Sequence, residues 1–286
     1  MRVAVIGPTG VLGRALVPML LQQGYTVRAL ARSTAKARTL FPQGVEIVAC
    51  DLLAVTAAEL LPMLEGCDAV AHIATAIPRD FTAPNAWDAN TRLRTDGVSV
   101  LLEASLGAGV GRYLQQSITM AYPDHGDDWI TEEAPLDASP ARVQVCAPVI
   151  AMEQMVRTTP LEKLQWCILR GGSFVGKDTS QENVLGRLRL GKEIVPCDGR
   201  NYTSLIHVSD MAAAVAAAVE NAPAGSVFNI VDDPLHYGEY LDRLADSIGV
   251  PRPRRDEVAT CPPSWRCSNQ AARARLRWQP SHSIIP

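Results

Sequence analysis

The glycine-rich segment GPTGVLG at residues 7–13 constrains the fold of this chain more than any other segment. The apolar run VAVI at residues 3–6 precedes it and predicts a buried strand, and apolar residues at helical spacing follow it as far as Gln23. The first amides of a helix have no partner within the helix and lie at the positive end of its dipole. Because glycine has no Cβ, the phosphates of a ligand reach these amides without a clash. The segment therefore predicts a pyrophosphate cradle made of backbone; the alternative is a strand-to-helix turn whose glycines serve packing only.

Strands and helices alternate along the first 170 residues. Apolar runs predict further strands at residues 25–31, 45–50, 67–74, 112–116 and 164–169. Helical patterns lie between them, at residues 57–64, from about 85 to 106 and at 149–157. This alternation predicts the α/β class, with a Rossmann-type, doubly wound parallel sheet and helices on both of its faces. Ligands of such sheets bind beyond the carboxyl ends of the strands.

Residues at the glycine turn and at the carboxyl ends of these strands make up the predicted cofactor-binding set. The set comprises Gly7, Thr9, Gly10, Val11, Leu12, Gly13, Arg32, Asp51, Leu52, Ala74, Thr75 and Ser117.

Arg32 follows the second predicted strand, where dinucleotide-binding proteins select their cofactor. An acidic residue there would bind the ribose hydroxyls of NAD, whereas an arginine suits the extra phosphate of NADP. No Asp or Glu lies between Tyr25 and Leu40. We therefore expect NADP as the cofactor, with NAD as the alternative; a solvated surface charge is the alternative role for Arg32.

The pattern loosens after Gly171, and we expect a second, smaller lobe there. Residues 1–170 and 205–235 are predicted to form the dinucleotide-binding domain, and residues 171–204 and 236–286 a small substrate-binding lobe. Alanine-rich residues 211–219 predict a helix, for which Asp210 is the expected N-terminal cap.

Composition excludes several classes of protein. A net charge of −3 over 286 residues gives no basis for nucleic-acid binding, and no apolar run approaches the roughly 18 residues that span a bilayer.

The seven cysteines are scattered, without a C-x-x-C pair, and we expect buried, reduced thiols. No spacing of His, Asp or Glu suggests a metal site. Because the first strand starts at residue 2 or 3, we expect no signal peptide and a cytoplasmic protein.

Motifs along nearly the whole chain resemble the NAD(P)-dependent epimerase/dehydratase branch of the short-chain dehydrogenase/reductase superfamily, of the extended or atypical type. They are the G-x-x-G-x-x-G turn, Asp51-Leu52, His72-Ile73-Ala74, Thr131-Glu132 with Pro135-Leu136, Leu169-Arg170-Gly171, the segment HVSDMA at 207–212 and the segment RLRWQP at 275–280. The resemblance implies a small-molecule substrate and a homodimer formed through two long helices. It also implies that Asp51 accepts a hydrogen bond from the adenine amino group; a turn aspartate is the alternative.

The chain departs from this family at the two residues that carry its chemistry. The resemblance implies a Tyr-x-x-x-Lys pair, in which the tyrosine moves the proton and the lysine holds the nicotinamide ribose and lowers the tyrosine pKa. The family's glutamate after this pair matches Glu153, which places Val145 at the tyrosine position and Val149 at the lysine position. Neither valine donates a proton. The family's catalytic hydroxyl position is Ile118 here, which leaves Ser117, Thr119 and Tyr122 as weak candidates; a hydrogen-bonded strand-end hydroxyl, or for Tyr122 a pocket wall, is the alternative.

Three functions remain open from the sequence. The first is an NADP-dependent oxidoreductase that acts on a small carbonyl-type substrate without the Tyr/Lys relay, the proton coming from water, from the substrate or from a hydroxyl such as that of Thr119 or Tyr122. The second is an NADP-binding sensor or regulator without chemistry. The third is a nucleotide-sugar-type epimerase or dehydratase, which the missing tyrosine disfavours.

Overall fold

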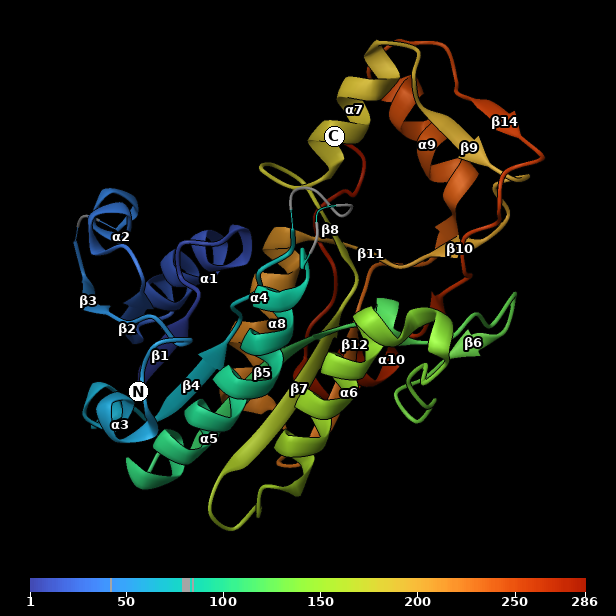
Figure 1. Ribbon diagram of the computed structural model, residues 1–286. Coiled ribbons are helices and arrows are strands. Elements are labelled where there is room, and N and C mark those ends of the chain that lie inside the picture. The colour runs from blue at the N-terminus through green and yellow to red at the C-terminus, as the bar shows by residue number, and fades with distance from the viewer. Residues whose placement is uncertain (42, 79–82, 84) are drawn as a thin grey trace. The chain divides into compact units, whose positions relative to one another are not determined.

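The computed structural model describes residues 1–41, 43–78, 83 and 85–286, and the chain forms two compact units (Figure 1). Unit 1 comprises residues 1–117, 137–169 and 212–227, and unit 2 comprises residues 118–136, 170–211 and 228–286. Four of the described elements contain residues of both units: β5 (Arg112–Ile118), β7 (Gln165–Gly171), α8 (Val208–Asn221) and β12 (Ser226–Ile230).

Unit 1 alternates strands and helices, as the sequence predicts. Its elements are β1 (Arg2–Ile6), α1 (Val11–Gln22), β2 (Thr26–Ala31), α2 (Thr34–Leu40), β3 (Val45–Ala49), α3 (Ala57–Leu64), β4 (Ala69–His72), α4 (Asp88–Arg92), the π-helix η1 (Leu93–Gly97), α5 (Val98–Gly107), β5 (Arg112–Ile118), the 3₁₀ turn η3 (Pro140–Arg142) and α6 (Val143–Thr158). The long helix expected from about residue 85 to 106 is present as α4, η1 and α5 in direct succession.

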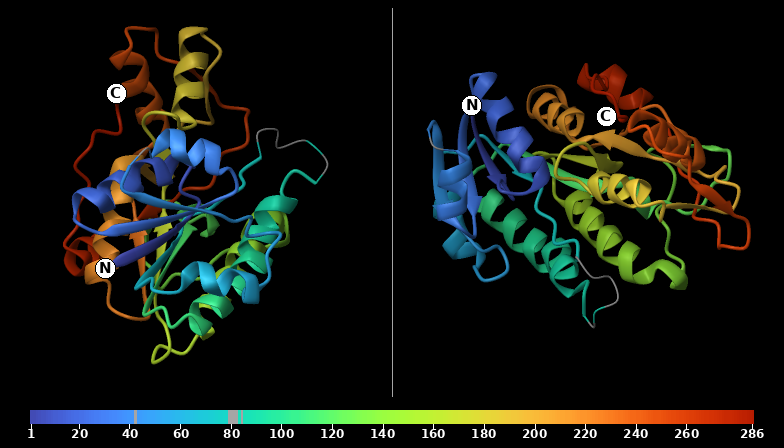
Figure 2. Two further views of the ribbon diagram at one scale, coloured as in Figure 1. Left: turned by 90° about the vertical axis from the view of Figure 1, so that its left-hand side faces the viewer. Right: turned by 90° about the horizontal axis from the view of Figure 1, so that it is seen from above.

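The central sheet has seven strands in the order β12-β7-β5-β4-β1-β2-β3. β1 pairs in parallel with β2 and with β4, and β2 with β3 and β4 with β5 are parallel as well. Helices α5 and α6 lie along one face of the sheet and α1 along the other (Figure 2). The predicted doubly wound sheet is thus confirmed, and the strand order reverses between β1 and β4, where such folds bind ligands.

Burial explains the unbroken apolar strands. Val3, Ala4 and Val5 on β1 have no exposed surface, and neither do Ala69, Val70 and Ala71 on β4. A parallel sheet covered by helices on both faces buries successive side chains on either side, which selects continuous apolar runs over alternating ones.

Helix α6 begins at Val143, six residues before the predicted start, and the prediction was wrong there. The predicted bounds, residues 149–157, left Pro148 outside the helix, and a proline in a helix interior is locally unfavourable because it removes a backbone donor. Pro148 instead lies buried inside α6, just as Pro18 lies inside α1 and Pro62 inside α3.

Unit 2 is built from short strands and helices. Its elements are the 3₁₀ turn η2 (Thr119–Ala121), β6 (Trp129–Ile130), β8 (Ser173–Val175), α7 (Gln181–Arg189), β9 (Ile194–Pro196), β10 (Tyr202–Thr203), β11 (Leu205–His207), β13 (Leu235–His236), α9 (Tyr237–Ser247), β14 (Arg254–Asp256), β15 (Arg266–Cys267) and α10 (Gln270–Leu276). Its main apolar core packs Leu241 and Leu244 of α9 against Leu188 of α7 and Val195 of β9.

Asp210 does not act as the expected helix cap. Its carboxylate is fully buried in the first turn of α8 and accepts hydrogen bonds from the backbone amides of Ser281 and His282, from the Ser281 hydroxyl and from Nδ1 of His282. Nδ1 of His207 accepts from the amide of Ser209 at the start of this helix. Asp210 therefore holds the C-terminal segment in place.

Cys197 and Cys261 form a disulfide in unit 2, so the expectation of reduced thiols was wrong for this pair. The two residues are 64 positions apart, and a spacing of that kind carries no pairing signal. The other cysteines, Cys50, Cys67, Cys146, Cys167 and Cys267, are free and buried, as expected. Among the described residues, we find no helix with the length and apolar character to cross a membrane.

Candidate functional site

The glycine turn between β1 and α1 is shaped by close backbone approaches. Gly7 has a φ of +92°, and a Cβ there would lie 2.7 Å from the Cα of Ala74. A Cβ on Gly13 would lie 2.3 Å from the carbonyl oxygen of Pro8. A Cβ on Gly10 would meet only the carbonyl oxygen of Gly7, at 3.4 Å. The backbone approaches at Gly7 and Gly13 therefore leave no room for a side chain, whereas no neighbour among the described residues requires a glycine at position 10.

The start of helix α1 is open to an anion. Gly10 is its N-cap, no side chain caps it, and its first turn contains no acidic residue. The uncompensated amides and the helix dipole both favour a negative group at this end. The open turn thus fits the diphosphate of a dinucleotide.

The other predicted cofactor contacts of unit 1 lie at the ends of strands. Ala74, which follows β4, lies against Gly7 at the point where the strand order reverses, and Thr75 beside it is exposed. Arg32 is exposed directly after β2. Asp51 is exposed after β3, and its Oδ1 accepts the amide of Leu53 at 3.2 Å. The remaining members vary in burial: Leu12, Gly13, Leu52 and Ser117 are buried, Thr9 and Val11 are half-buried, and Gly10 is exposed.

Two of the candidate hydroxyls are buried and hydrogen-bonded. Ser117 ends β5 in unit 1, and its hydroxyl donates to the Glu153 carboxylate at 2.7 Å. Thr119, in unit 2, directs its hydroxyl to the carbonyl oxygen of Gly171 at 3.4 Å. Neither geometry favours a role in proton transfer to a substrate.

Tyr122 is the centre of a buried network in unit 2. Its hydroxyl accepts a hydrogen bond from Arg170 at 2.6 Å and donates one to Asn229 at 2.9 Å, and Arg170 also donates to the carbonyl oxygen of Glu132. Burial raises the pKa of the Tyr122 phenol above its ordinary value, and the nearby Arg170 guanidinium offsets this only in part. A buried phenol with a raised pKa that already donates its proton is poorly suited to general acid catalysis.

We expect Tyr122→Phe to lower the free energy of unfolding and to leave any turnover with a reduced nicotinamide unchanged. The variant removes the buried hydrogen bonds that the phenol makes with Arg170 and Asn229, at a cost of about 1–3 kcal/mol. Urea unfolding and the rate of cofactor oxidation measure the two effects. A rate that falls by about 100-fold in a variant of unchanged stability would instead identify Tyr122 as the proton donor.

The positions of the absent Tyr/Lys pair lie on helix α6. Val149 is fully buried and Val145 is half-buried. Glu153, one turn after Val149, is also buried and lies 3.6 Å from a guanidinium nitrogen of Arg157. The carboxylate is thereby engaged with Ser117 and Arg157. Cys146 in the same stretch is buried, and burial raises the pKa of its thiol, which disfavours it as a general acid.

Unit 1 also buries a polar cluster that the sequence analysis did not assign to the site. Nδ1 of His72 lies 3.0 Å from Oε1 of Gln115, which also accepts the hydroxyl of Tyr113. Burial, with a smaller contribution from the charge of Arg94, lowers the pKa of His72 to about 4, against the opposing effect of the hydrogen bond with Gln115. His72 is therefore neutral at pH 7 and structural, as its apolar surroundings in the sequence suggest.

The sequence analysis did not predict a buried role for Arg94, which lies on the π-helix η1. It is buried, with a nitrogen 3.5 Å from the sulfur of Met152, and burial lowers its pKa to about 10, against the opposing effect of Glu153. Its only sequence signal was a cation inside a helix that packs on a sheet.

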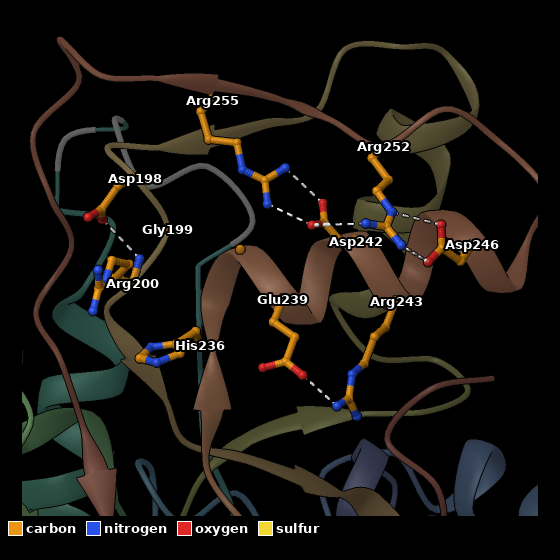
Figure 3. A pocket seen from close by; sticks show the side chains of 11 residues that line it. Asp198, Gly199, Arg200, His236, Glu239, Asp242, Arg243, Asp246, Arg252 and Arg255 are labelled. Carbon is orange, nitrogen blue, oxygen red and sulfur yellow. Dashed lines mark hydrogen bonds and ion pairs between the residues drawn. The ribbon is translucent and has the colours of Figure 1, made fainter.

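Unit 2 has two hollows with different walls. One, of about 360 Å³, surrounds the start of α9 and is lined by ion pairs (Figure 3). Arg255 pairs with Asp242, and Arg252 pairs with Asp246. The other hollow, of about 410 Å³, lies beside β9 and β10 and has mostly apolar walls. No cluster of three or more metal-binding side chains occurs in the part of the chain that the structure describes.

Comparison with known proteins gives one family and several relatives. The model of the NAD dependent epimerase/dehydratase family matches residues 3–231. A 3-diazoavenalumate denitrifying reductase from a Streptomyces species is 32% identical over 299 residues, which cover 99% of this chain and 97% of the reductase. A 4-hydroxy-2-methyl-3-oxo-4-farnesyl-3,4-dihydroquinoline-1-oxide ketoreductase from Stigmatella aurantiaca is 26% identical, over 96% of this chain and 78% of that protein.

Solved structures share the fold at lower identity. A dTDP-glucose 4,6-dehydratase from Streptomyces venezuelae, solved with NAD and TYD, has a TM-score of 0.80 at 22% identity, and the match covers 99% of this chain and 93% of that one. A UDP-glucuronic acid 4-epimerase from Bacillus cereus, solved with UDP-glucuronic acid and NAD, has a TM-score of 0.81 at 17% identity, over 99% and 95% of the two chains. Likeness at this level concerns the fold.

Proposed function

Because this chain belongs to the NAD dependent epimerase/dehydratase family, we propose that it is an NADP-dependent reductase that works without a Tyr/Lys proton relay. The observation that carries this proposal is that the relay residues are replaced by valines and that the candidate hydroxyls are buried and hydrogen-bonded. Val145 and Val149 occupy the relay positions, and the candidate hydroxyls of Ser117, Thr119 and Tyr122 are buried with partners of their own.

The cofactor is held mainly by backbone in this proposal. The amides at the start of α1, opened by Gly10, receive the diphosphate, and Arg32 receives the 2′-phosphate of NADP. In the same proposal, Asp51 and Leu52 would contact the adenine, and Ala74 and Thr75, which follow β4 at the strand-order reversal, would contact the pyrophosphate. When bound, the reduced nicotinamide supplies a hydride.

Without the Tyr/Lys relay, a substrate whose reduction needs no proton donor is favoured. Hydride addition to a carbonyl produces an alkoxide, which needs a proton donor. An aromatic diazonium group needs none: a C–H bond forms at the ring carbon, the C–N bond breaks, and its electron pair leaves with N₂. The cation and the hydride together give a neutral arene. Because a relative that matches 99% of this chain is named a 3-diazoavenalumate denitrifying reductase, we infer as the substrate class an acid that carries a diazonium group on an aromatic ring.

Deuterium transfer tests this function directly. The purified protein is mixed with NADPH that carries deuterium at the transferred position and with diazotised 3-aminocinnamate. We expect one deuterium at the ring carbon that lost nitrogen, one N₂ per NADPH oxidised, and a hydride-transfer rate that varies little between about pH 6 and 8, since no group with a pKa in that range takes part. A reaction that proceeds equally without protein, or a product without deuterium, refutes the proposal.

A ketone reductase is the second candidate, favoured by the similarity to the ketoreductase from Stigmatella aurantiaca. Water or the substrate itself would then supply the proton, and the loss of general acid catalysis would cost about 10²–10⁴ in rate. A carbonyl compound that consumes NADPH where the diazonium acid does not would favour this candidate. Cofactor binding without turnover of either class would favour a sensor.

We expect Arg32→Asp to weaken NADP binding by about 10- to 100-fold and to strengthen NAD binding, because the substitution removes a phosphate ligand and adds a partner for the ribose hydroxyls. Arg38→Asp is the matched control: Arg38 is also exposed, lies in the last turn of α2 and undergoes the same change of charge. Calorimetric titration with each coenzyme measures the effect. Equal losses in the two variants would show that Arg32 acts only through net charge.

A further inference from the structure

The hollow beside β9 and β10 in unit 2 has the character of a small-molecule site. Its apolar walls are Ile194, Pro196, Tyr237, Pro262 and Trp265, all of them half-buried. A volume of about 410 Å³ lies within the ordinary range of ligand sites, which combine apolar walls with a few polar groups. We propose that this hollow binds a flat, uncharged aromatic part of the substrate. The assignment rests on the proposed reductase function and names the kind of substrate body that it accepts.

Trp265 forms a fixed wall of this hollow. Its indole nitrogen donates to the carbonyl oxygen of Tyr122 at 2.9 Å, and its backbone amide donates to the carbonyl oxygen of Tyr202 at 3.0 Å. The ring also packs against the small core around Tyr122, Ile130 and Cys267. An indole held in this way has little conformational entropy to lose when a ligand stacks on it, which favours aromatic ligands.

The polar groups of the hollow fit an uncharged ligand. Glu193 is buried, and its carboxylate pairs with Arg187. Among the described residues, the side chains of Asn201 and Thr203 make no hydrogen bond, although both line the hollow. An amide and a hydroxyl without partners are able to orient a neutral ligand by hydrogen bonding.

The lining of the hollow disfavours a nucleotide diphosphate. None of the side chains that line it is an arginine, lysine or histidine. A diphosphate would enter without a cation and beside the carboxylate of Glu193, which is electrostatically unfavourable. Three of the four arginines that line the other hollow, Arg243, Arg252 and Arg255, are engaged with carboxylates, which leaves Arg200 as the one arginine of that lining for a phosphate (Figure 3).

The disulfide holds two of the walls. Cys197 follows Pro196 directly, and Cys261 precedes Pro262 directly. The amide of Cys197 also donates to the carbonyl oxygen of Asp256 at 2.9 Å. Because the bond ties together the two segments that supply these prolines, we expect its loss to loosen the hollow and to weaken ligand binding.

Ligand-observed NMR with cinnamamide, a neutral aromatic probe, tests the assignment. For a fragment of this size we expect a Kd of about 1 mM. Trp265→Ala should weaken binding at least about 10-fold, whereas Trp265→Phe should retain most of it, because a ring remains for stacking. Trp129→Ala is the matched control, since Trp129 is 51% exposed and does not line the hollow. Cys197→Ser with Cys261→Ser should weaken binding about 3-fold or more.

Two further measurements make the test decisive. UDP, used as a nucleotide diphosphate probe, should not displace cinnamamide; displacement of cinnamamide by UDP, or equal cinnamamide binding in Trp265→Ala and the parent, overturns the assignment. NADPH titration of the same variants should give unchanged affinity. A parent protein that binds cinnamamide but neither coenzyme would refute the proposed reductase and leave the hollow's assignment standing, so the two failures are distinguishable.

Discussion

Gly10→Ala is expected to weaken NADP binding by at least about 100-fold while the protein remains folded. A Cβ at this position meets only the carbonyl oxygen of Gly7, at 3.4 Å, so the turn accommodates it. Gly10 has a φ of −74°, a value open to alanine. In the proposed site, the methyl group would instead occupy the approach to the amides of α1, where the diphosphate would come closest to the backbone. Calorimetric titration with NADPH measures the affinity, and thermal unfolding without cofactor measures the stability.

Two other glycines are controls for this variant. Gly186→Ala in α7 (Gln181–Arg189) should lower neither the NADPH affinity nor the thermal stability, because nothing lies within 4 Å of the added Cβ and alanine favours a helix. Gly13→Ala should damage both, because its Cβ would lie 2.3 Å from the carbonyl oxygen of Pro8. If Gly10→Ala binds NADPH like the parent, the turn at residues 7–13 is a packing device and the diphosphate site lies elsewhere.

The parts of the fold that sequence reasoning predicted depend on local signals. The turn at residues 7–13 lies between an apolar run and a helical pattern, and each of these signals spans only a few residues. The strand-order reversal follows from the same alternation, because right-handed crossovers leave few arrangements of the strands. The contact between Gly7 and Ala74 adds what the sequence could not show, namely which strand end lies against the glycine turn.

The parts that sequence reasoning missed depend on partners distant in the chain. The Tyr122 hydroxyl is unsuitable as a proton donor because it is hydrogen-bonded to Arg170 and Asn229. These residues lie 48 and 107 positions away in the sequence. The disulfide between Cys197 and Cys261 is of the same kind. The start of α6 differs from the prediction for another reason. Proline is locally unfavourable in a helix interior, and the tertiary burial of this helix outweighs that local preference at Pro148.

Several expectations stay predictions. The domain limits at residues 1–170 and 205–235, the homodimer and the residues that contact the cofactor each await a direct measurement. Of these, the cofactor contacts matter most for the proposed reductase, in which Val145 and Val149 replace the relay and the coenzyme would supply the hydride. Limited proteolysis and sedimentation would address the first two.

Asp210→Ala is expected to lower the free energy of unfolding by about 3 kcal/mol, the second large effect. The carboxylate is fully buried and accepts two backbone amides, the Ser281 hydroxyl at 2.9 Å and Nδ1 of His282 at 2.7 Å. Truncation leaves these donors unpaired and releases the segment around residues 281–282 from α8 (Val208–Asn221). Asp233→Ala is the control, because Asp233 is 80% exposed in its pair with Arg273 and should contribute little. Urea unfolding of the three proteins at pH 7 measures the difference.

The same carboxylate gives the stability a defined dependence on pH. Burial alone would raise the pKa of Asp210, but the hydrogen bonds from His282 and Ser281 outweigh it and hold the pKa below its ordinary value of 3.8. Since folding lowers this pKa, the ionised carboxylate stabilises the folded state above about pH 4, and the contribution is lost as the pH falls through the folded-state pKa. The stability difference between the parent and Asp210→Ala should therefore shrink as the pH falls below about 4. A difference that persists undiminished at pH 3 would mean that the carboxylate stabilises the C-terminal segment by packing and not by its charge.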